Sequence, residues 1–181
     1  MKSPVLFTDR LILRQFQPED YLDLHEYLSD PEVVRFEPYE TFSLKQSKAE
    51  AESRANSQFY WAVCLKDTGK VIGNLYFHPE EYETFEIGYV FNRFYQKHGY
   101  ALESCNAFFE YAFQTLHARR IIALCSTENV NSWTLMERLH MRREGCFLQN
   151  VAFKKDSDGN PIYFDSYEYA ILRQDFKNFS P

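Results

Sequence analysis

The spacing of hydrophobic and polar residues divides the chain into short strands and amphipathic helices. In residues 8–14, Leu11 and Leu13 alternate with polar positions, a pattern typical of a strand with one buried face. Apolar residues then recur at helical spacing through residues 18–28, and Pro18 is a residue type that favours the first turn of a helix. The chain is therefore expected to open with a strand and a helix.

The middle of the chain predicts a second helix followed by antiparallel strands. Ser43 and Gln46 have the spacing of a capping box, in which each side chain bonds the backbone of the other residue. Further on, Asp67-Thr68-Gly69 separates two alternating segments and is a strong signal for a short hairpin. The expected elements are a helix at 43–58 and strands at 59–66, 70–78 and 84–91.

The longest amphipathic stripe lies in the second half of the chain and indicates a helix packed against the sheet. It is formed by Leu102, Cys105, Phe109, Ala112, Phe113 and Leu116. The elements expected after it are a strand at 120–126, a helix at 131–139 and long strands at 142–154 and 161–172. A helix between two strands of one sheet implies a parallel crossover. We therefore expect one domain over residues 1–181, of the α+β class, with a mixed, mostly antiparallel sheet of about seven strands flanked by helices.

Composition supports a folded domain and narrows its partners. Of the 181 residues, 45% are hydrophobic and 18% are aromatic, which is enough to bury a sizeable core and argues against disorder. A net charge of −6 argues against nucleic acid as a partner, because no basic surplus is available for phosphate contacts. No apolar run approaches the ~20 residues that span a bilayer, and no signal peptide is recognisable. We expect a cytoplasmic protein with no membrane partner.

The cysteines and histidines predict no metal site. The four cysteines show no CxxC pair and the five histidines show no HxxxH pair. Zinc sites typically draw their ligands from such short spacings. The thiols of Cys64, Cys105, Cys125 and Cys146 are expected to stay free, and no metal cofactor is predicted.

The most informative stretch for chemistry is Gln-Lys-His-Gly-Tyr-Ala at residues 96–101, between a predicted strand and the longest predicted helix. The N–H groups of a helix's first turn have no partner within the helix, and the helix dipole adds positive potential, so such a loop can bind an anion. Gly99 permits close approach of a ligand to the backbone, and Ala101 leaves the helix start uncrowded. An ordinary helix entry that contains glycine has the same local pattern.

Several motifs, in order along the chain, resemble the GNAT superfamily of acetyltransferases. The segment 96–101 is similar to the family's Gln/Arg-x-x-Gly-x-Gly/Ala pyrophosphate loop. Glu86-Ile-Gly-Tyr-Val90 precedes it where the family has its fourth strand. Asn129 and Ser132 resemble the Asn-x-x-Ser/Ala element at the end of the fifth strand. Because these motifs occur together and in the family's order, the resemblance is specific.

The likeness extends to both ends of the chain. The segments 8–14 and 165–173 resemble the branch that contains the ribosomal-protein alanine N-acetyltransferases. The resemblance implies a GNAT fold, in which strands four and five splay apart, and acetyl-coenzyme A (acetyl-CoA) as co-substrate. It places Gln96, Lys97, His98, Gly99, Tyr100 and Ala101 at the pyrophosphate, and Tyr89, Val90, Phe91, Asn129 and Ser132 along the pantetheine arm.

The resemblance also points to two catalytic side chains. Glu86 is either a general base that reaches the acceptor amine through water or a solvent-facing carboxylate of its strand. Ser132 either donates a hydrogen bond to the coenzyme sulfur or caps the following helix. Met136 stands where many relatives have the tyrosine that protonates the thiolate, and methionine cannot donate a proton. His140 stands where relatives have glycine, which a positive φ would favour.

These inferences predict an acetyl-CoA-dependent N-acetyltransferase that acts on a primary amine. The branch resemblance favours a protein N-terminal amine. Polyamines, amino acids and antibiotics stay open as acceptors, because a fold does not determine its substrate. The alternative is a coenzyme-A-binding sensor or ribosome-associated module without turnover, which the same pyrophosphate loop would serve. The sequence pattern does not distinguish a monomer from a homodimer.

Overall fold

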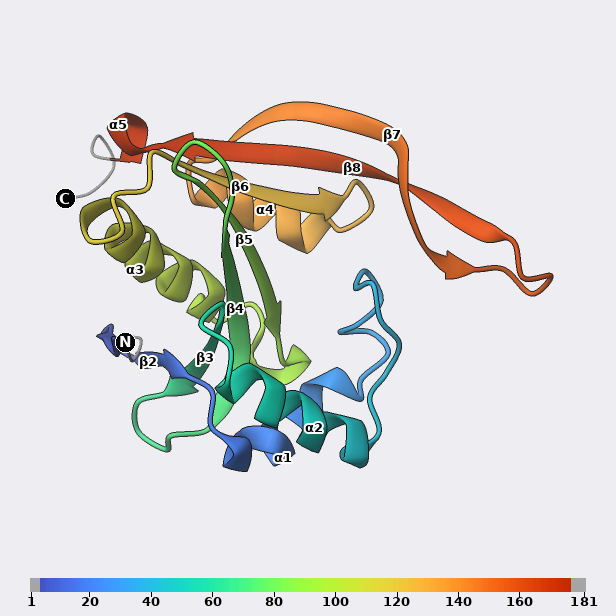
Figure 1. Ribbon diagram of the computed structural model, residues 1–181, viewed down its shortest axis with the longest axis horizontal. Helices are drawn as coiled ribbons and strands as arrows, with labels where there is room; N and C mark the ends of the chain where they lie inside the picture. The colour runs from blue at the N-terminus through green and yellow to red at the C-terminus, as the bar shows by residue number, and fades with distance from the viewer. Residues whose placement is uncertain (1–3, 177–181) are drawn as a thin grey trace.

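The computed structural model describes residues 4–176 and contains an eight-stranded sheet in the order β1-β2-β3-β4-β5-β6-β8-β7 (Figure 1). The strands are β1 Leu6–Phe7, β2 Leu11–Gln15, β3 Tyr60–Leu65, β4 Val71–Pro79, β5 Thr84–Phe91, β6 Arg120–Ser126, β7 Arg142–Lys155 and β8 Pro161–Leu172. Neighbouring strands are antiparallel except β5 and β6, which are parallel. The structure confirms the mixed, mostly antiparallel sheet, and the short β1 adds one strand to the expected seven.

Helices cover both faces of the sheet, and each face has its own hydrophobic core. The helices are α1 Tyr21–Leu28, α2 Leu44–Ala55, α3 Tyr100–Gln114, α4 Val130–Arg138 and α5 Arg173–Phe176. Along β3, Ala62 and Cys64 belong to the core under α1 and α2, whereas Trp61 and Val63 belong to the core under α3 and α4. The pleat of the strand therefore sends alternate side chains to the two helical layers.

The hydrophobic pattern predicts most of these elements, with errors at their ends. β5, β6 and β8 begin and end at the expected residues. Ser43 and Gln46 form the expected capping box of α2, but this helix ends at Ala55 rather than near residue 58. The stripe predicted for α3 extends too far, because the helix ends at Gln114 and Leu116 is 38% exposed.

The hairpin of β7 and β8 is longer than the other strand pairs and extends past the rest of the sheet (Figure 1). Its ladder is interrupted by register shifts, which bend the far half of the hairpin. Near its end, the Lys154 ammonium donates to the Tyr39 carbonyl at 3.3 Å and to the Glu40 carboxylate at 3.1 Å. The hairpin thus holds the loop that connects α1 to α2.

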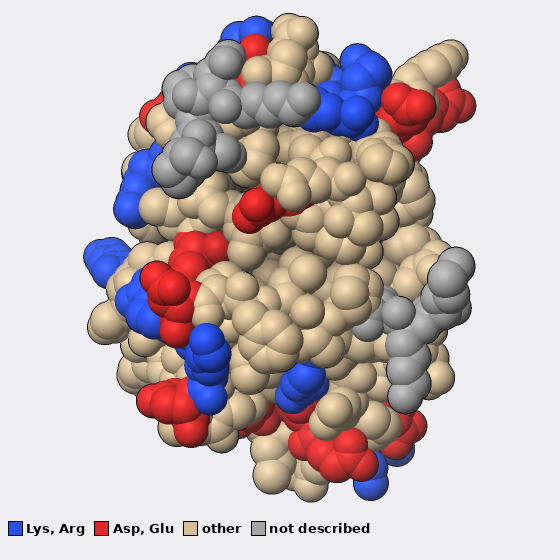
Figure 2. All heavy atoms as spheres, turned by 90° about the vertical axis from the view of Figure 1, so that its left-hand side faces the viewer, with Lys and Arg blue, Asp and Glu red and all other residues tan. Residues whose placement is uncertain are grey.

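The face that carries α3 presents mostly uncharged side chains at its centre, and charged residues gather toward its edges (Figure 2). Along α3, the exposed positions Asn106, Glu110 and Gln114 recur every four residues and form one polar stripe. The opposite side of this helix lies in the core. Within residues 4–176, no helix is both long and apolar enough to cross a bilayer.

Gly73 allows β4 to approach the end of β5 closely. It lies opposite Phe91 in the ladder between the two strands. A Cβ atom at position 73 would lie 2.6 Å from the Val90 carbonyl oxygen and 2.6 Å from Cδ1 of Phe91. Because both distances are shorter than van der Waals contact, glycine is required where the two strands meet.

We expect Gly73→Ala to lower the free energy of unfolding by about 1–3 kcal/mol, because the added methyl group must displace backbone atoms of β5. The matched control is Gly145→Ala in β7, where the new Cβ would lie 3.6 Å from the Phe147 ring, an ordinary contact. Urea unfolding followed by circular dichroism measures both variants. Equal loss of stability in the two would contradict this account of Gly73.

Candidate active site

The site begins where β5 and β6 part. The two strands pair only from Thr84–Arg120 to Glu86–Ile122, although β5 continues to Phe91 and β6 to Ser126. Beyond Glu86 the strands diverge and leave a fork in the sheet. The expected fold has splayed strands four and five. When the short β1 is left out of the count, these are β5, which pairs with β4, and its parallel neighbour β6.

The hydrogen-bonding alternation of β5 determines which backbone groups face this fork. Asn92 N–H donates to Ile72 O at 2.9 Å, and Glu80 N–H donates to Thr84 O at 2.8 Å. In an antiparallel ladder such pairs recur at every second residue, so the even-numbered residues of β5 bond β4. The N–H and C=O groups of Tyr89 and Phe91 consequently face the fork. Those of Val90 face β4, so the backbone of Val90 is not available to a ligand there.

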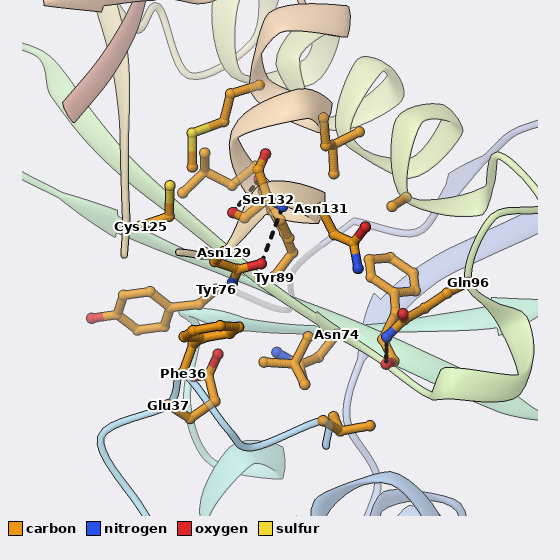
Figure 3. Close-up of a pocket in the computed structure, with 18 of the residues that line it drawn as sticks. Phe36, Glu37, Asn74, Tyr76, Tyr89, Gln96, Cys125, Asn129, Asn131 and Ser132 are labelled. Atoms are coloured by element: carbon orange, nitrogen blue, oxygen red, sulfur yellow. Dashed lines mark hydrogen bonds between the residues drawn. The ribbon is translucent and has the colours of Figure 1, made fainter. Parts of the chain in front are cut away.

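A cavity of about 760 Å³ passes through the fork and joins both faces of the sheet. In Figure 3, Ser132, Asn129 and Cys125 lie on one side of it, and Phe36 and Glu37 lie on the opposite side. The cavity is lined by all but one of the residues predicted for the site, namely Glu86, Tyr89, Val90, Phe91, Gln96, Lys97, Gly99, Tyr100, Ala101, Asn129 and Ser132. The exception is His98, which is exposed and does not line the cavity.

At one end, the cavity meets the N-terminus of α3. Gly99 is the N-cap residue, with φ of +83° and no side chain to bond the first-turn N–H groups. These groups therefore point outward beside Ala101 and can bind an anion. The Gln96 side-chain amide donates to the Phe91 carbonyl at 3.0 Å, which ties the loop to the end of β5. Lys97 adds a cation to this part of the lining.

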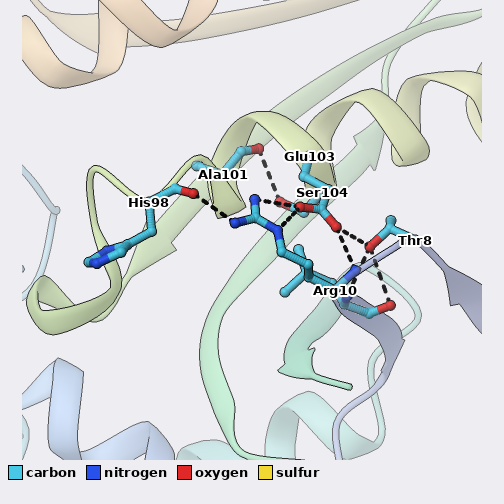
Figure 4. A network of polar contacts seen from close by, with 7 residues as sticks. Thr8, Arg10, His98, Ala101, Glu103 and Ser104 are labelled. Carbon is cyan, nitrogen blue, oxygen red and sulfur yellow. Dashed lines mark hydrogen bonds and ion pairs between the residues drawn. The ribbon is translucent and has the colours of Figure 1, made fainter. Parts of the chain in front are cut away.

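Residues of the turn before β2 bond both the loop at 96–101 and the first turn of α3 (Figure 4). The Arg10 guanidinium donates to the His98 carbonyl at 3.0 Å and to the Glu103 carboxylate at 2.7 Å. The same carboxylate accepts hydrogen bonds from Thr8 Oγ1 at 2.6 Å and from the Arg10 backbone at 2.9 Å. Although burial alone would raise the pKa of Glu103, these hydrogen bonds lower it, so the group stays ionised. His98 thus helps to fix the loop through its backbone carbonyl, which accepts from Arg10.

Where the fork opens, hydroxyl groups from β5 and α4 meet. The Tyr89 hydroxyl lies 3.0 Å from Ser132 Oγ and donates to the Ser132 carbonyl at 3.1 Å. Asn129 is the N-cap of α4, because its side-chain oxygen accepts from Ser132 N–H at 3.2 Å. The Ser132 hydroxyl is therefore not the helix cap. Met136 is 1% exposed and packs in the core under α3 and α4.

Glu86 lies on the other face of β5, among groups from β3 and β4. It stands directly opposite His78 in the ladder, and the rings of Tyr60 and Tyr76 are 5.1 Å apart beside it. Burial raises the pKa of the Glu86 carboxyl, and the charge of Glu80 raises it further, against an opposing effect of His78. A carboxyl with a raised pKa is a stronger base than an exposed one.

The loop before α2 adds a second carboxylate to this face. Glu37 lines the cavity, and burial raises its pKa against the opposing effects of a Tyr39 hydrogen bond and the charges of Arg54 and Lys154. Arg54, on α2, is 2% exposed and bonds Glu50 at 2.7 Å and the Asn74 side chain at 2.9 Å. Since Arg54 already has a carboxylate partner, Glu37 is left without an ion pair among the described residues.

Several of these groups could not be found from the sequence. Glu37, Arg54 and Asn74 come from a loop, from α2 and from β4, and they share no spacing that marks a site. The role of Arg10 depends on its contact with Glu103, which is 93 positions away in the chain. His140 has a φ of +58°. The sequence indicated this left-handed conformation, because relatives have glycine at the position.

Comparison with known proteins identifies the family. A family model described as an acetyltransferase (GNAT) domain matches residues 10–142. The uncharacterized N-acetyltransferase YnaD of Bacillus subtilis (strain 168) is 36% identical over 171 residues, which cover 93% of this chain and 97% of the relative. The crystal structure of a GNAT-family acetyltransferase from Bacillus anthracis superposes with a TM-score of 0.84 at 34% identity, covering 94% of this chain and 99% of that one.

A more distant structure has the same fold. Spermidine N-acetyltransferase from Vibrio cholerae, in complex with CoA and spermine, superposes with a TM-score of 0.77 at 18% identity, covering 94% of this chain and 100% of that one. At this identity the likeness concerns the fold alone. The family match and the two relatives above 30% identity carry the assignment. This chain therefore belongs to the GNAT family of acetyltransferases.

Proposed function

We propose that the protein transfers an acetyl group from acetyl-CoA to a primary amine that reaches the site as a cation. The observation that carries this proposal is the single cavity through the fork, which joins the anion-binding start of α3 to the carboxylates of the opposite face. One end suits a pyrophosphate and the other suits an ammonium group. The two substrates can therefore meet between β5 and β6.

The coenzyme end supports binding of acetyl-CoA in an extended form. The backbone around Gly99 and Ala101 would hold the pyrophosphate, with Lys97 as a neighbouring cation. The backbone groups of Tyr89 and the N–H of Phe91, which face the fork, would bond the amides of the pantetheine arm as a neighbouring strand does. Their N–H groups would also stabilise negative charge on the thioester oxygen as the amine attacks.

Glu86 would act on the attacking amine, and Ser132 would act on the departing sulfur. Glu86 accepts the amine proton through a water molecule, and its raised pKa brings the carboxylate closer to the strength needed near neutral pH. On the other face, the Ser132 hydroxyl donates a hydrogen bond to the sulfur as the carbon–sulfur bond breaks. Because side chains alternate across β5, the base and this donor act from opposite faces of the same strand.

The lining of the acceptor face favours a cationic amine. It contains the carboxylates of Glu32, Glu37 and Glu86, while the buried Arg54 is already paired with Glu50. Rings of Tyr60 and Tyr76 beside Glu86 can interact with an ammonium group through their faces. The resemblance to the ribosomal-protein branch favours a protein N-terminus, and the fold neighbour from Vibrio cholerae is named for spermidine. Both acceptors carry the positive charge that this face would recognise.

A coenzyme-A-binding module without turnover is the second candidate. Met136 at the position of the usual acid favours it, because a core methionine cannot protonate a thiolate. A panel of amines assayed by release of free coenzyme thiol separates the two functions. Acetyl-CoA binding without thiol release from any amine would favour the module.

We expect Gly99→Asn to lower acetyl-CoA affinity by at least about tenfold, because a side chain would cover the N–H groups of α3. Asparagine tolerates the positive φ at this position, so the backbone can be retained. The matched control is Gly69→Asn, where φ is +73° and no atom lies within 4 Å of the new Cβ. Calorimetric titration measures both. Wild-type affinity in folded Gly99→Asn would remove the loop from the site.

We expect Glu86→Gln to lower kcat/KM by about 100-fold while acetyl-CoA affinity is retained, because the amide cannot accept a proton. In the wild type, kcat/KM should rise with pH as the Glu86 carboxyl loses its proton, and this acidic limb should disappear in the variant. Glu80→Gln is the matched control. Removing this neighbouring negative charge lowers the pKa of Glu86, so the limb should move to lower pH. A wild-type profile in Glu86→Gln would show that Glu86 is a solvent-facing carboxylate.

We expect Glu37→Gln to raise KM for the amine by about threefold to tenfold, since it removes a partly buried negative charge from the acceptor face. Affinity for acetyl-CoA should not change. Glu40→Gln on the same loop is the control, because Glu40 is 81% exposed and pairs with Lys154. Steady-state assays with matched monoamines and diamines measure the effect. An equal KM change in both variants would assign it to the loop rather than to the Glu37 charge.

A further inference from the structure

We propose that Tyr89 is a positioning residue whose hydroxyl directs the Ser132 proton at the sulfur of the departing thiolate. This inference rests on the proposed acetyl transfer and deepens it, because it names the group that makes Ser132 an effective donor. Tyr89 has an odd position in β5, so its backbone faces the fork while its side chain reaches the layer of α4. Tyr89 therefore belongs to the strand that borders the fork, and its hydroxyl bonds a residue of α4.

The contact between the two hydroxyls allows two arrangements of their protons. Tyr89 Oη lies 3.1 Å from the Ser132 carbonyl and 3.0 Å from Ser132 Oγ. In the first arrangement Tyr89 donates to the carbonyl and accepts the Ser132 proton. In the second, Tyr89 donates to Ser132 Oγ, which frees the Ser132 proton to point into the cavity. A hydroxyl that accepts one hydrogen bond also donates a stronger one.

The second arrangement matches what the departing sulfur requires. When the tetrahedral intermediate collapses, the carbon–sulfur bond breaks, its electron pair stays on sulfur, and the carbonyl of the new amide forms. The ammonium group has already given one proton to Glu86 through water, and the second proton leaves its nitrogen to solvent water as the amide forms. The negative sulfur then accepts the Ser132 hydrogen bond, and Ser132 Oγ accepts that of Tyr89. The coenzyme leaves as a thiolate and takes its proton from water.

Tyr89 keeps its own proton throughout this step. Burial raises the pKa of the Tyr89 hydroxyl, against the opposing hydrogen bond of Ser132. A thiol ionises at about 8.5, so a thiolate is far too weak a base to deprotonate this tyrosine. Tyr89 therefore acts through Ser132 by orientation and polarisation. The phenol acid that Met136 cannot supply from α4 is replaced here by a phenol from β5 that donates without ionising.

The other ionisable groups around this pair come from four elements. They are Cys105 of α3, Cys125 of β6, Tyr169 of β8 and Arg143 of β7. Burial raises the pKa of both cysteine thiols, against the opposing hydrogen bonds of Ser104 at Cys105 and of Ser132 at Cys125, so they stay protonated at neutral pH. Arg143 bonds the Tyr169 hydroxyl at 2.8 Å, and its charge is held there. A neutral thiol is a weak acceptor, so the Ser132 proton is drawn more strongly to a negative coenzyme sulfur than to Cys125.

The test is the pKa of the coenzyme thiol in the binary complex with CoA, measured from thiolate absorbance against pH. Subtracting the same titration with desulfo-CoA, which lacks the sulfur, removes the signals of Cys105 and Cys125. We expect Ser132→Ala to raise the bound thiol pKa by about one to two units, and Tyr89→Phe by about half a unit to one unit. The double variant should match Ser132→Ala, because Tyr89 acts through Ser132.

Turnover should follow the same order. We expect kcat to fall about threefold to tenfold in Tyr89→Phe and about tenfold to 100-fold in Ser132→Ala, with the double variant equal to the latter. Tyr111→Phe is the matched control, because it removes a phenol from the same core cluster at a position outside the cavity. It should leave the bound thiol pKa and kcat unchanged.

Two results would overturn the proposal. One is a Tyr89→Phe variant that loses thermal stability but keeps the wild-type thiol pKa, which would make the contact structural. The other is an unchanged thiol pKa in Ser132→Ala, which decides the question even if Tyr89→Phe does not fold. Because the titration needs only bound CoA, it is independent of the acceptor. A shifted thiol pKa together with no acetylation of any amine would support the hydroxyl pair and reject the proposed function.

Discussion

The loss of pairing between β5 and β6 is the constraint on which the rest of the structure depends. The strands share three residue pairs and then separate, so the backbone groups of Tyr89 and Phe91 lack a neighbouring strand. Buried N–H and C=O groups need partners, and a ligand with its own amides can supply them. The Gln96 side chain satisfies one of these groups, the Phe91 carbonyl, and attaches the loop that starts α3 to the same place. The Gln96–Phe91 hydrogen bond therefore fixes the predicted anion site to the fork.

The same strand also separates the two chemical tasks. Pleating sends the Glu86 side chain to the layer of α1 and α2 and the Tyr89 side chain to the layer of α3 and α4. In the proposed reaction, an amine that enters from the first layer would meet the Glu86 carboxyl, whose pKa burial raises. A sulfur on the second side meets two hydroxyls. In this proposal, proton removal and stabilisation of the thiolate take place on opposite faces of β5, so the two groups do not compete for the same space.

Much of this arrangement could be predicted from sequence, because it follows local rules. Alternating and helical spacings predict β5, β6 and α3, and the residue types at 96–101 predict a loop and helix start that line the cavity. Val90 lines the cavity as predicted, but its backbone faces β4, because the phase of a strand's hydrogen bonding is set by the partner strand, which sequence does not show. The Arg10–Glu103 contact and the cavity position of Glu37 depend on segments far apart in the chain, so no local pattern reveals them.

The acceptor face is built on different principles from the fork, and this explains why the fold determines the reaction more closely than the acceptor. Its floor is a buried network in which Asn74 Oδ1 accepts from Tyr27 at 3.1 Å and from Arg54 at 2.9 Å. Breaking a buried charged network costs several kcal/mol, so this floor is rigid. Glu37, by contrast, lies on a loop that the Lys154 ammonium of the long hairpin holds through surface contacts. Surface contacts of this kind contribute little stability, so loop and hairpin can change without disturbing the fork. If Glu37 binds the acceptor as proposed, acceptor specificity resides in the parts of this structure that the sheet constrains least.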